Sequence, residues 1–190
     1  MEKIVMHNLI KAIGVLRSRF VENLRCIETG TIRSYSEKHN STLHISNELK
    51  DRGRLISVDI NPESIRISKD VCRACSNISW IHSDSLVYLK NQKDTFHFAF
   101  LDSVNNRDHI FEEFKLIVPH MLPGGIIVVD DAGVNSTGLE QVGILPEKGR
   151  KVSEFLLSLG YENFVCSSSH GNQLWINVDE LNLLYQKSKS

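Results

Sequence analysis

Short apolar runs that alternate with helix-like stretches constrain the fold of this 190-residue chain more than any other feature. Each run is followed by a polar turn and then by apolar residues at helical spacing. The apolar runs cover residues 25–28, 55–59, 78–81, 96–101 and 126–130, and the helix-like stretches cover residues 42–49, 63–72, 85–89 and 109–118. This order predicts right-handed β-α-β units and therefore a parallel sheet with helices on both faces.

Segments before and after this alternation complete a single predicted domain over residues 1–190. Two later apolar runs, at 163–167 and 173–178, predict an antiparallel hairpin that turns at Gly171 and Asn172. We expect the polar tail at 185–190 to fray. The predicted parts are a leading helix (1–23), a ligand-binding core (24–131), a substrate-side loop (132–147), and a closing helix and hairpin (148–190).

The charge balance argues against a nucleic-acid partner. The chain carries 22 Lys and Arg against 23 Asp and Glu, so we expect no long-range positive field. No apolar run approaches the roughly 20 residues of a membrane span, and the N-terminal segment lacks the apolar core of a secretory signal. These patterns predict a cytoplasmic protein that acts on a small molecule, and they leave both a monomer and a homodimer open. Cys72 and Cys75 form a single C-x-x-C pair, which we interpret as ordinary reduced thiols.

Acidic residues end or follow every central apolar run. Because the carboxyl ends of parallel strands meet at one edge of an open sheet, where ligands bind, we expect these side chains to surround one site. They are Glu28, Asp59, Asp84, Asp102, Asp130 and Asp131.

Gly30 and Asp59 are placed to bind a nucleoside. Gly30 suits a sharp turn whose backbone N–H groups stay exposed to a carboxylate or phosphate. A carboxylate at Asp59 can accept from both ribose hydroxyls, although it is also an ordinary polar strand end. Asp84, beside Ser83, can accept from an adenine amino group and also suits a helix N-cap.

Three segments together resemble class I S-adenosylmethionine-dependent methyltransferases, including the catechol and caffeoyl-coenzyme A O-methyltransferase branch. They are LISVDINPE at 55–63, FLD at 100–102 and LPGGIIVVDD at 122–131. The resemblance implies a Rossmann-like methyltransferase fold, with a mostly parallel seven-stranded sheet and a C-terminal antiparallel hairpin. It also implies an enzyme that binds S-adenosylmethionine and methylates an oxygen of a small-molecule acceptor.

The resemblance also implies the residues that bind the cofactor. Glu28 and Gly30 would shape the loop at its methionine side, and Asp102 would lie near the sulfonium and the amine. The full implied set is Glu28, Gly30, Thr31, Ser41, Asp59, Ile60, Ser83, Asp84 and Asp102.

The loop after Gly30 departs from the family pattern. The family has a second glycine soon after the first, whereas residues 31–40 contain none, so the loop is expanded. We expect Arg33 and Tyr35 in this loop to be solvated, with contact to the cofactor as the alternative.

Asp102, Asp130 and Asp131 match positions that hold a divalent ion in the catechol-type branch. Hard oxygen ligands suit Mg²⁺ or another divalent cation, which would lower the pKa of a bound acceptor hydroxyl. Asp131 stands where the branch has a carboxamide, so the site gains a negative charge. The alternative is that these carboxylates only end strands or organise water and the cofactor.

The catalytic base is less well defined by the sequence. The branch places a lysine three residues after its first aspartate, and Asn105 stands there in this chain. The candidate catalytic residues are Asp102, Asn105 and His109, with His109 as the candidate base. A solvated helix position is the alternative for His109.

Two other functions remain as alternatives. An NAD-dependent oxidoreductase also needs an acidic residue after the second strand, but the chain lacks the G-x-G-x-x-G pattern. A catalytically inactive S-adenosylmethionine-binding protein would account for the missing lysine and the expanded loop.

Overall fold

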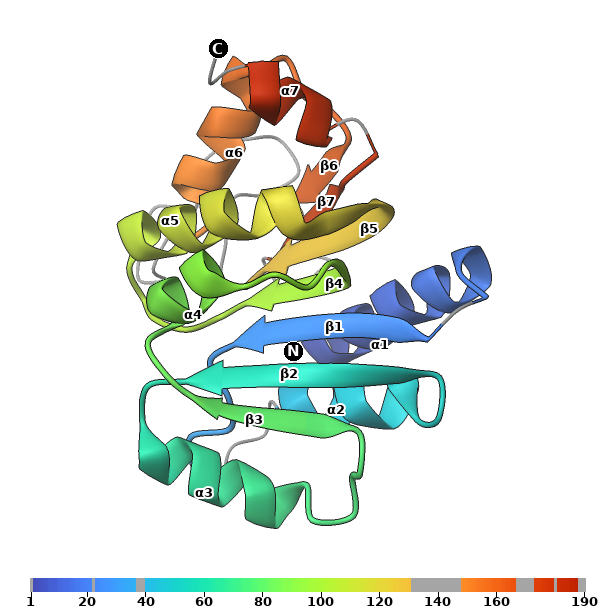
Figure 1. The fold of residues 1–190 in the computed structure, drawn as a ribbon, viewed down its shortest axis with the longest axis vertical. Helices are drawn as coiled ribbons and strands as arrows, with labels where there is room; N and C mark the ends of the chain where they lie inside the picture. The colour runs from blue at the N-terminus through green and yellow to red at the C-terminus, as the bar shows by residue number, and fades with distance from the viewer. Residues whose placement is uncertain are drawn as a thin grey trace.

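The protein is described here by a computed structural model, which covers residues 2–21, 23–36, 40–130, 148–166, 173–179 and 181–187. Within these residues a seven-stranded sheet forms the centre of the molecule, in the order β3-β2-β1-β4-β5-β7-β6 (Figure 1). The strands are β1 (Leu24–Thr29), β2 (Gly53–Asp59), β3 (Ile78–His82), β4 (Phe96–Leu101), β5 (Met121–Val129), β6 (Phe164–Cys166) and β7 (Leu174–Asn177).

The predicted mostly parallel α/β fold is confirmed. Strands β1 to β5 pair in parallel, while β7 pairs antiparallel with β5 and with β6. The turn predicted at Gly171 and Asn172 lies outside the described residues.

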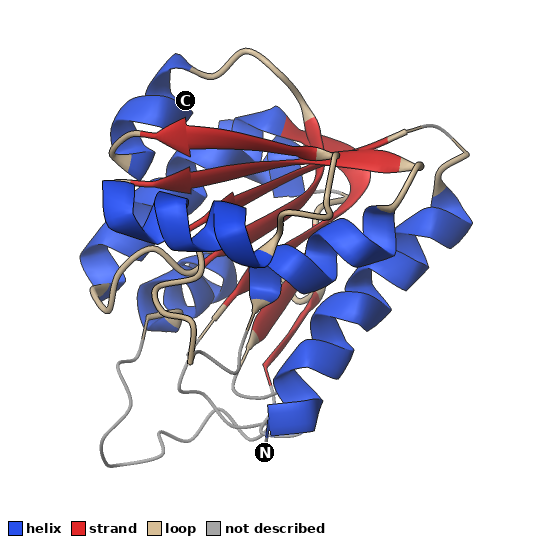
Figure 2. Ribbon diagram, turned by 90° about the horizontal axis from the view of Figure 1, so that it is seen from below, coloured by secondary structure: helices blue, strands red, loops and turns tan. Residues whose placement is uncertain are grey.

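Helices lie on both faces of the sheet, as Figure 2 shows. Helices α1 and α2 cover one face, while α4 and α5 cover the other (Figure 1). The helices are α1 (Glu2–Arg19), α2 (Ser41–Leu49), α3 (Pro62–Val71), α4 (Ser85–Asn91), α5 (Arg107–Ile117), α6 (Arg150–Ser158) and α7 (Leu181–Lys187), with a 3-10 turn at Val118–His120. Among the described residues, no helix combines the length and the apolar character needed to cross a membrane.

Strand β4 shows why its sequence is a continuous apolar run. All six of its residues are buried. Phe98 and Phe100 pack into the core shared with α1 and α2, whereas Ala99 and Leu101 pack into the core on the opposite face. A strand covered on both faces is apolar at nearly every position, so the alternating pattern of a half-exposed strand is absent. His97 is the polar exception, and its Nδ1 accepts a hydrogen bond from the Arg25 backbone N–H at 3.0 Å.

The C-terminal segment differs from the prediction of a frayed tail. Leu181–Lys187 forms α7, in which Leu181 and Tyr185 are buried. The Tyr185 hydroxyl donates a hydrogen bond to the Lys115 carbonyl at 2.9 Å. For residues 185–187 the prediction was wrong, because it considered only local polarity, while this part of the segment is held by burial against α5 and its 3-10 extension. Residues 188–190 lie outside the described residues.

The ends of β1 and β4 meet where the strand order reverses, which is where open α/β sheets bind ligands. Gly30 follows β1 with φ +83°, a backbone conformation that favours glycine. A Cβ at Gly30 would lie 2.4 Å from the backbone oxygen of Asp102. The Asp102 N–H donates to the Thr29 carbonyl at 3.0 Å, so the two strand ends are held in direct contact.

We expect Gly30→Ala to lower the free energy of unfolding by about 2 kcal/mol or more, because alanine is strained at positive φ and would press on backbone that cannot move aside. Gly14 provides the matched control, since it lies in α1 with no atom within 4 Å of an added Cβ. Gly14→Ala should raise the free energy of unfolding by roughly 0.5–1 kcal/mol. Urea denaturation of both variants measures the difference, and a neutral Gly30→Ala would contradict the close contact.

Candidate functional site

A pocket of about 230 Å³ opens beyond the carboxyl ends of β1 to β4. Each of these strands or the turn after it contributes to the wall, and the first turns of α4 and α5 complete it. The lining residues are Gly30, Val58, Asp59, Ile60, Asp84, Ser85, Ser103, Val104 and His109. The fold therefore brings together five residues singled out from the sequence, namely Gly30, Asp59, Ile60, Asp84 and His109.

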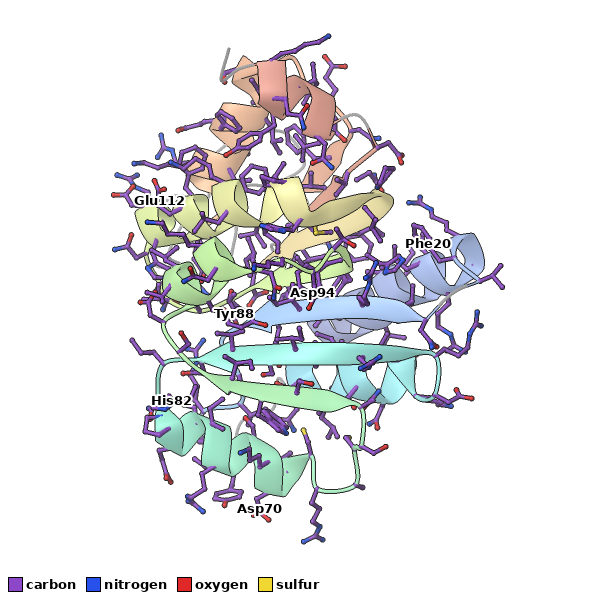
Figure 3. The ribbon with its side chains drawn as sticks, viewed as in Figure 1. Phe20, Asp70, His82, Tyr88, Asp94 and Glu112 are labelled. Carbon is purple, nitrogen blue, oxygen red and sulfur yellow. The ribbon has the colours of Figure 1, made fainter. Side chains whose placement is uncertain are left out.

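Asp59 organises the turns on either side of the pocket. One carboxylate oxygen accepts from the Thr31 backbone N–H at 3.0 Å, and the other accepts from the Asn61 N–H at 2.7 Å. His82, at the end of β3 (Figure 3), lies with Nε2 3.0 Å from the Ile60 carbonyl. These bonds hold the Ile60 turn in place, although the Ile60 side chain itself is 65% exposed.

Asp84 and Ser83 form the turn between β3 and α4. The Asp84 carboxylate accepts from the Val87 N–H at 3.0 Å, so the N-cap that the sequence suggested is present. The Ser83 hydroxyl donates to the carbonyl of Asp84 at 3.0 Å and does not belong to the pocket lining.

Glu28 is buried next to the site and holds neighbouring elements together. Its side chain is fully buried, and it accepts from the Ser57 hydroxyl at 2.7 Å and from the Ser41 hydroxyl at 3.3 Å. Burial raises the pKa of Glu28 to about 7, although the hydroxyl donors oppose this shift. Glu28 and Ser41 are absent from the pocket lining, so in this structure they join β1, β2 and the start of α2.

The Thr31 side chain points into the protein. Its hydroxyl lies 3.0 Å from the Thr42 hydroxyl and 2.7 Å from that of Ser68. Ile32, the next residue, is buried against α3. These contacts fasten the start of the expanded loop without a second glycine, and they leave the Thr31 backbone N–H facing Asp59.

His109 lies in the first turn of α5, beside α4. Its Nε2 is 3.0 Å from the Ser85 hydroxyl and 3.4 Å from Oε1 of Glu113, a fully buried residue. The other Glu113 oxygen accepts from the Thr29 hydroxyl at 3.0 Å. The hydrogen bond with Glu113 raises the pKa of His109. His109 therefore belongs to the pocket wall on the Ser85 side, and its role as a base stays a prediction.

Two cationic side chains contact Asp102, and neither contact was predicted from the sequence. Lys148, only 1% exposed, forms an ion pair with one carboxylate oxygen. Arg33 lies 3.7 Å from the other oxygen and also donates to the Asp102 carbonyl at 3.2 Å. The sequence indicated only that Lys148 begins a helix, because nothing local marks a partner 46 residues away. Asn105 is exposed on the loop after β4 and is not part of the pocket lining.

The Lys148 ammonium opposes the binding of a divalent metal at Asp102. An ion held about 4 Å from the Lys148 ammonium would meet a repulsion of roughly 8 kcal/mol at an effective dielectric constant of about 20. Asp130 accepts from the Gln173 amide at 2.9 Å, and Asp131 lies outside the described residues. In the part of the chain that is described, no group of three His, Cys, Asp or Glu side chains could hold a metal ion. The structure therefore describes only two of the three predicted metal ligands, Asp102 and Asp130.

A comparison with protein families matches residues 38–132 to the methyltransferase domain. A search of curated protein sequences finds no match.

Solved structures show the same fold at low sequence identity. The O-methyltransferase TomG from Streptomyces achromogenes, involved in tomaymycin synthesis and solved with S-adenosylmethionine, is 17% identical, with a TM-score of 0.60 over 90% of this chain and 79% of that one. The N-methyltransferase NodS from Bradyrhizobium japonicum WM9 is 16% identical, with a TM-score of 0.55 over 90% of both chains. Cofactor-bound Rv0187 from MTB is 12% identical, with a TM-score of 0.61 over 92% of this chain and 79% of that one.

The buried Glu28 carboxyl should make stability depend on pH. Its pKa is raised from 4.5 to about 7, so the folded state retains a proton that the unfolded state releases. This contribution to stability is complete below about pH 4.5 and is lost as the pH rises to about 7, by roughly 3 kcal/mol. Glu28→Gln should remove this loss, so the variant should gain stability relative to the wild type between pH 4.5 and 8.

Denaturant unfolding at a series of pH values measures this difference. Glu162→Gln makes the same exchange at an exposed position and serves as the control. A Glu28→Gln variant with the same pH dependence as the wild type would show that Glu28 does not titrate in this range.

Proposed function

This chain belongs to the methyltransferase domain family. We propose that it is a class I S-adenosylmethionine-dependent enzyme that methylates an oxygen of a small molecule and binds its cofactor in the pocket described above. The observation that carries the proposal is the convergence of Gly30, Asp59 and Asp84 on one pocket, from the ends of three neighbouring strands.

The chemistry of the pocket suits an adenosine. A carboxylate offers about four acceptor positions, and the two N–H donors at Asp59 leave room for ribose hydroxyls. Asp84, which caps α4 with one oxygen, can accept an adenine amino proton at the other end of the pocket. The exposed apolar side chains of Ile60 and Val104 would contact the ring itself.

The methionine part of the cofactor would extend past Gly30 toward Asp102. Gly30 has no side chain there, so its backbone can approach a ligand closely. When bound, S-adenosylmethionine supplies an electrophilic methyl group on a sulfonium. The pocket residues would hold the cofactor by its nucleoside, so that the methyl group faces an acceptor in a fixed direction.

The charge balance favours a small acceptor, and the segments that resemble the catechol-type branch favour an oxygen target. The nearly neutral charge of 22 basic and 23 acidic side chains provides no field for a nucleic-acid backbone. TomG, which shares the fold, is an O-methyltransferase, although NodS is an N-methyltransferase. The metal expected from the sequence is not part of the proposal, because Lys148 occupies the place beside Asp102.

Calorimetric titration tests the cofactor site. We expect S-adenosylmethionine and S-adenosylhomocysteine to bind the wild type, and NAD not to bind. Asp59→Ala should lower the affinity for S-adenosylhomocysteine by at least about 30-fold, because hydrogen bonds to a charged group are worth about 2 kcal/mol. Asp70→Ala is the matched control, since Asp70 is exposed on α3 (Figure 3).

Two results would contradict the proposal. Binding of NAD without either sulfur nucleoside would favour the oxidoreductase alternative. Cofactor binding without formation of S-adenosylhomocysteine, across a panel of phenols, catechols and aliphatic alcohols, would favour the catalytically inactive alternative.

A further inference from the structure

The ion pair between Lys148 and Asp102 lies next to the pocket, beside Gly30, although neither residue belongs to the pocket lining. Lys148 comes from the turn just before α6, while Asp102 follows β4 and touches Gly30 through its backbone. The Lys148 side chain is 1% exposed and that of Asp102 is 23% exposed. A lysine buried to this degree loses its hydration, and it stays charged only if a partner compensates for that loss.

We propose that the Lys148 ammonium, in place of a divalent metal ion, is the resident cation that balances Asp102 beside the methyl donor. This inference rests on the proposed function, which places the sulfonium of the cofactor near Asp102. Lys148 acts through Asp102 and is therefore a positioning residue.

The charge balance matters because methyl transfer consumes the positive charge of the cofactor. The acceptor oxygen forms a bond to the methyl carbon while the carbon–sulfur bond breaks. The electron pair of that bond goes to sulfur, and the acceptor proton passes to water. An unbalanced carboxylate would stabilise the sulfonium before the reaction more than in the transition state, where its charge is already dispersed, and would slow the transfer. Lys148 removes this penalty by neutralising Asp102.

The position of Arg33 strengthens the assignment. Its guanidinium reaches the second Asp102 oxygen and the Asp102 carbonyl from the expanded loop, but the side chain is half exposed and screened by solvent. Lys148 is the buried member of the pair of cations, so it is the one that acts at low dielectric. With both cations present, Asp102 has little remaining negative charge with which to attract a divalent ion.

The two forms of the cofactor provide a test, because S-adenosylmethionine carries a charge at sulfur that S-adenosylhomocysteine lacks. Lys148→Met removes the buried cation and keeps most of the volume of the side chain. We expect the affinity for S-adenosylmethionine to rise by about ten-fold relative to that for S-adenosylhomocysteine. A merely structural loss would change both affinities by the same factor. Lys151→Met is the matched control, because Lys151, in the first turn of α6, pairs with Asp108 of α5 at the surface.

In a second experiment, Mn²⁺ is titrated into the wild-type protein without cofactor, and bound Mn²⁺ is measured by electron paramagnetic resonance. We expect no site tighter than about 100 µM. An affinity ratio unchanged by Lys148→Met, or a tighter Mn²⁺ site that Asp102→Asn abolishes, would overturn the inference. A wild type that binds neither sulfur nucleoside would instead contradict the proposed function, and the Mn²⁺ arm alone would then decide which cation Asp102 holds.

Discussion

The contact between Gly30 and the backbone of Asp102 is the constraint on which the site depends. Strands β1 and β4 are neighbours at the point where the strand order reverses, and their ends are joined by a hydrogen bond from Asp102 to Thr29. No side chain fits between them, since a Cβ on Gly30 would lie 2.4 Å from the Asp102 oxygen. This close approach fixes the Asp102 backbone directly beside Gly30, at the edge of the pocket that Gly30 and Asp59 line.

Hydrogen bonds between buried polar side chains stabilise this arrangement of the strand ends. Glu28 joins Ser41 and Ser57, while Glu113 joins Thr29 to His109. Such networks are costly if any member is left unpaired, and they restrict the number of ways in which the strand ends can pack. The acidic strand ends therefore differ in role: Asp59 and Asp84 face the pocket, Glu28 is a fully buried support, and Asp102 pairs with Lys148.

The order of elements was predictable because it depends on local pattern. A short, mostly apolar run between polar turns, such as residues 96–101, favours a buried strand, and Asp84 caps α4 through a residue only three positions away. The C-terminal helix α7 was not predictable in this way. Tyr185 reaches a carbonyl 70 residues earlier in the chain, and no local signal marks that contact.

The sequence by itself determined the alternation of strands and helices, and with it the edge of the sheet where Gly30, Asp59 and Asp84 converge. A parallel sheet brings the carboxyl ends of its strands together, so the positions of residues along the chain are enough to assign those ends to one site. Only the tertiary structure shows which cationic side chain compensates the charge of Asp102. Lys148 reaches it from the turn before α6, and pairing of a buried charge depends on which side chains meet in space, not on their spacing along the chain.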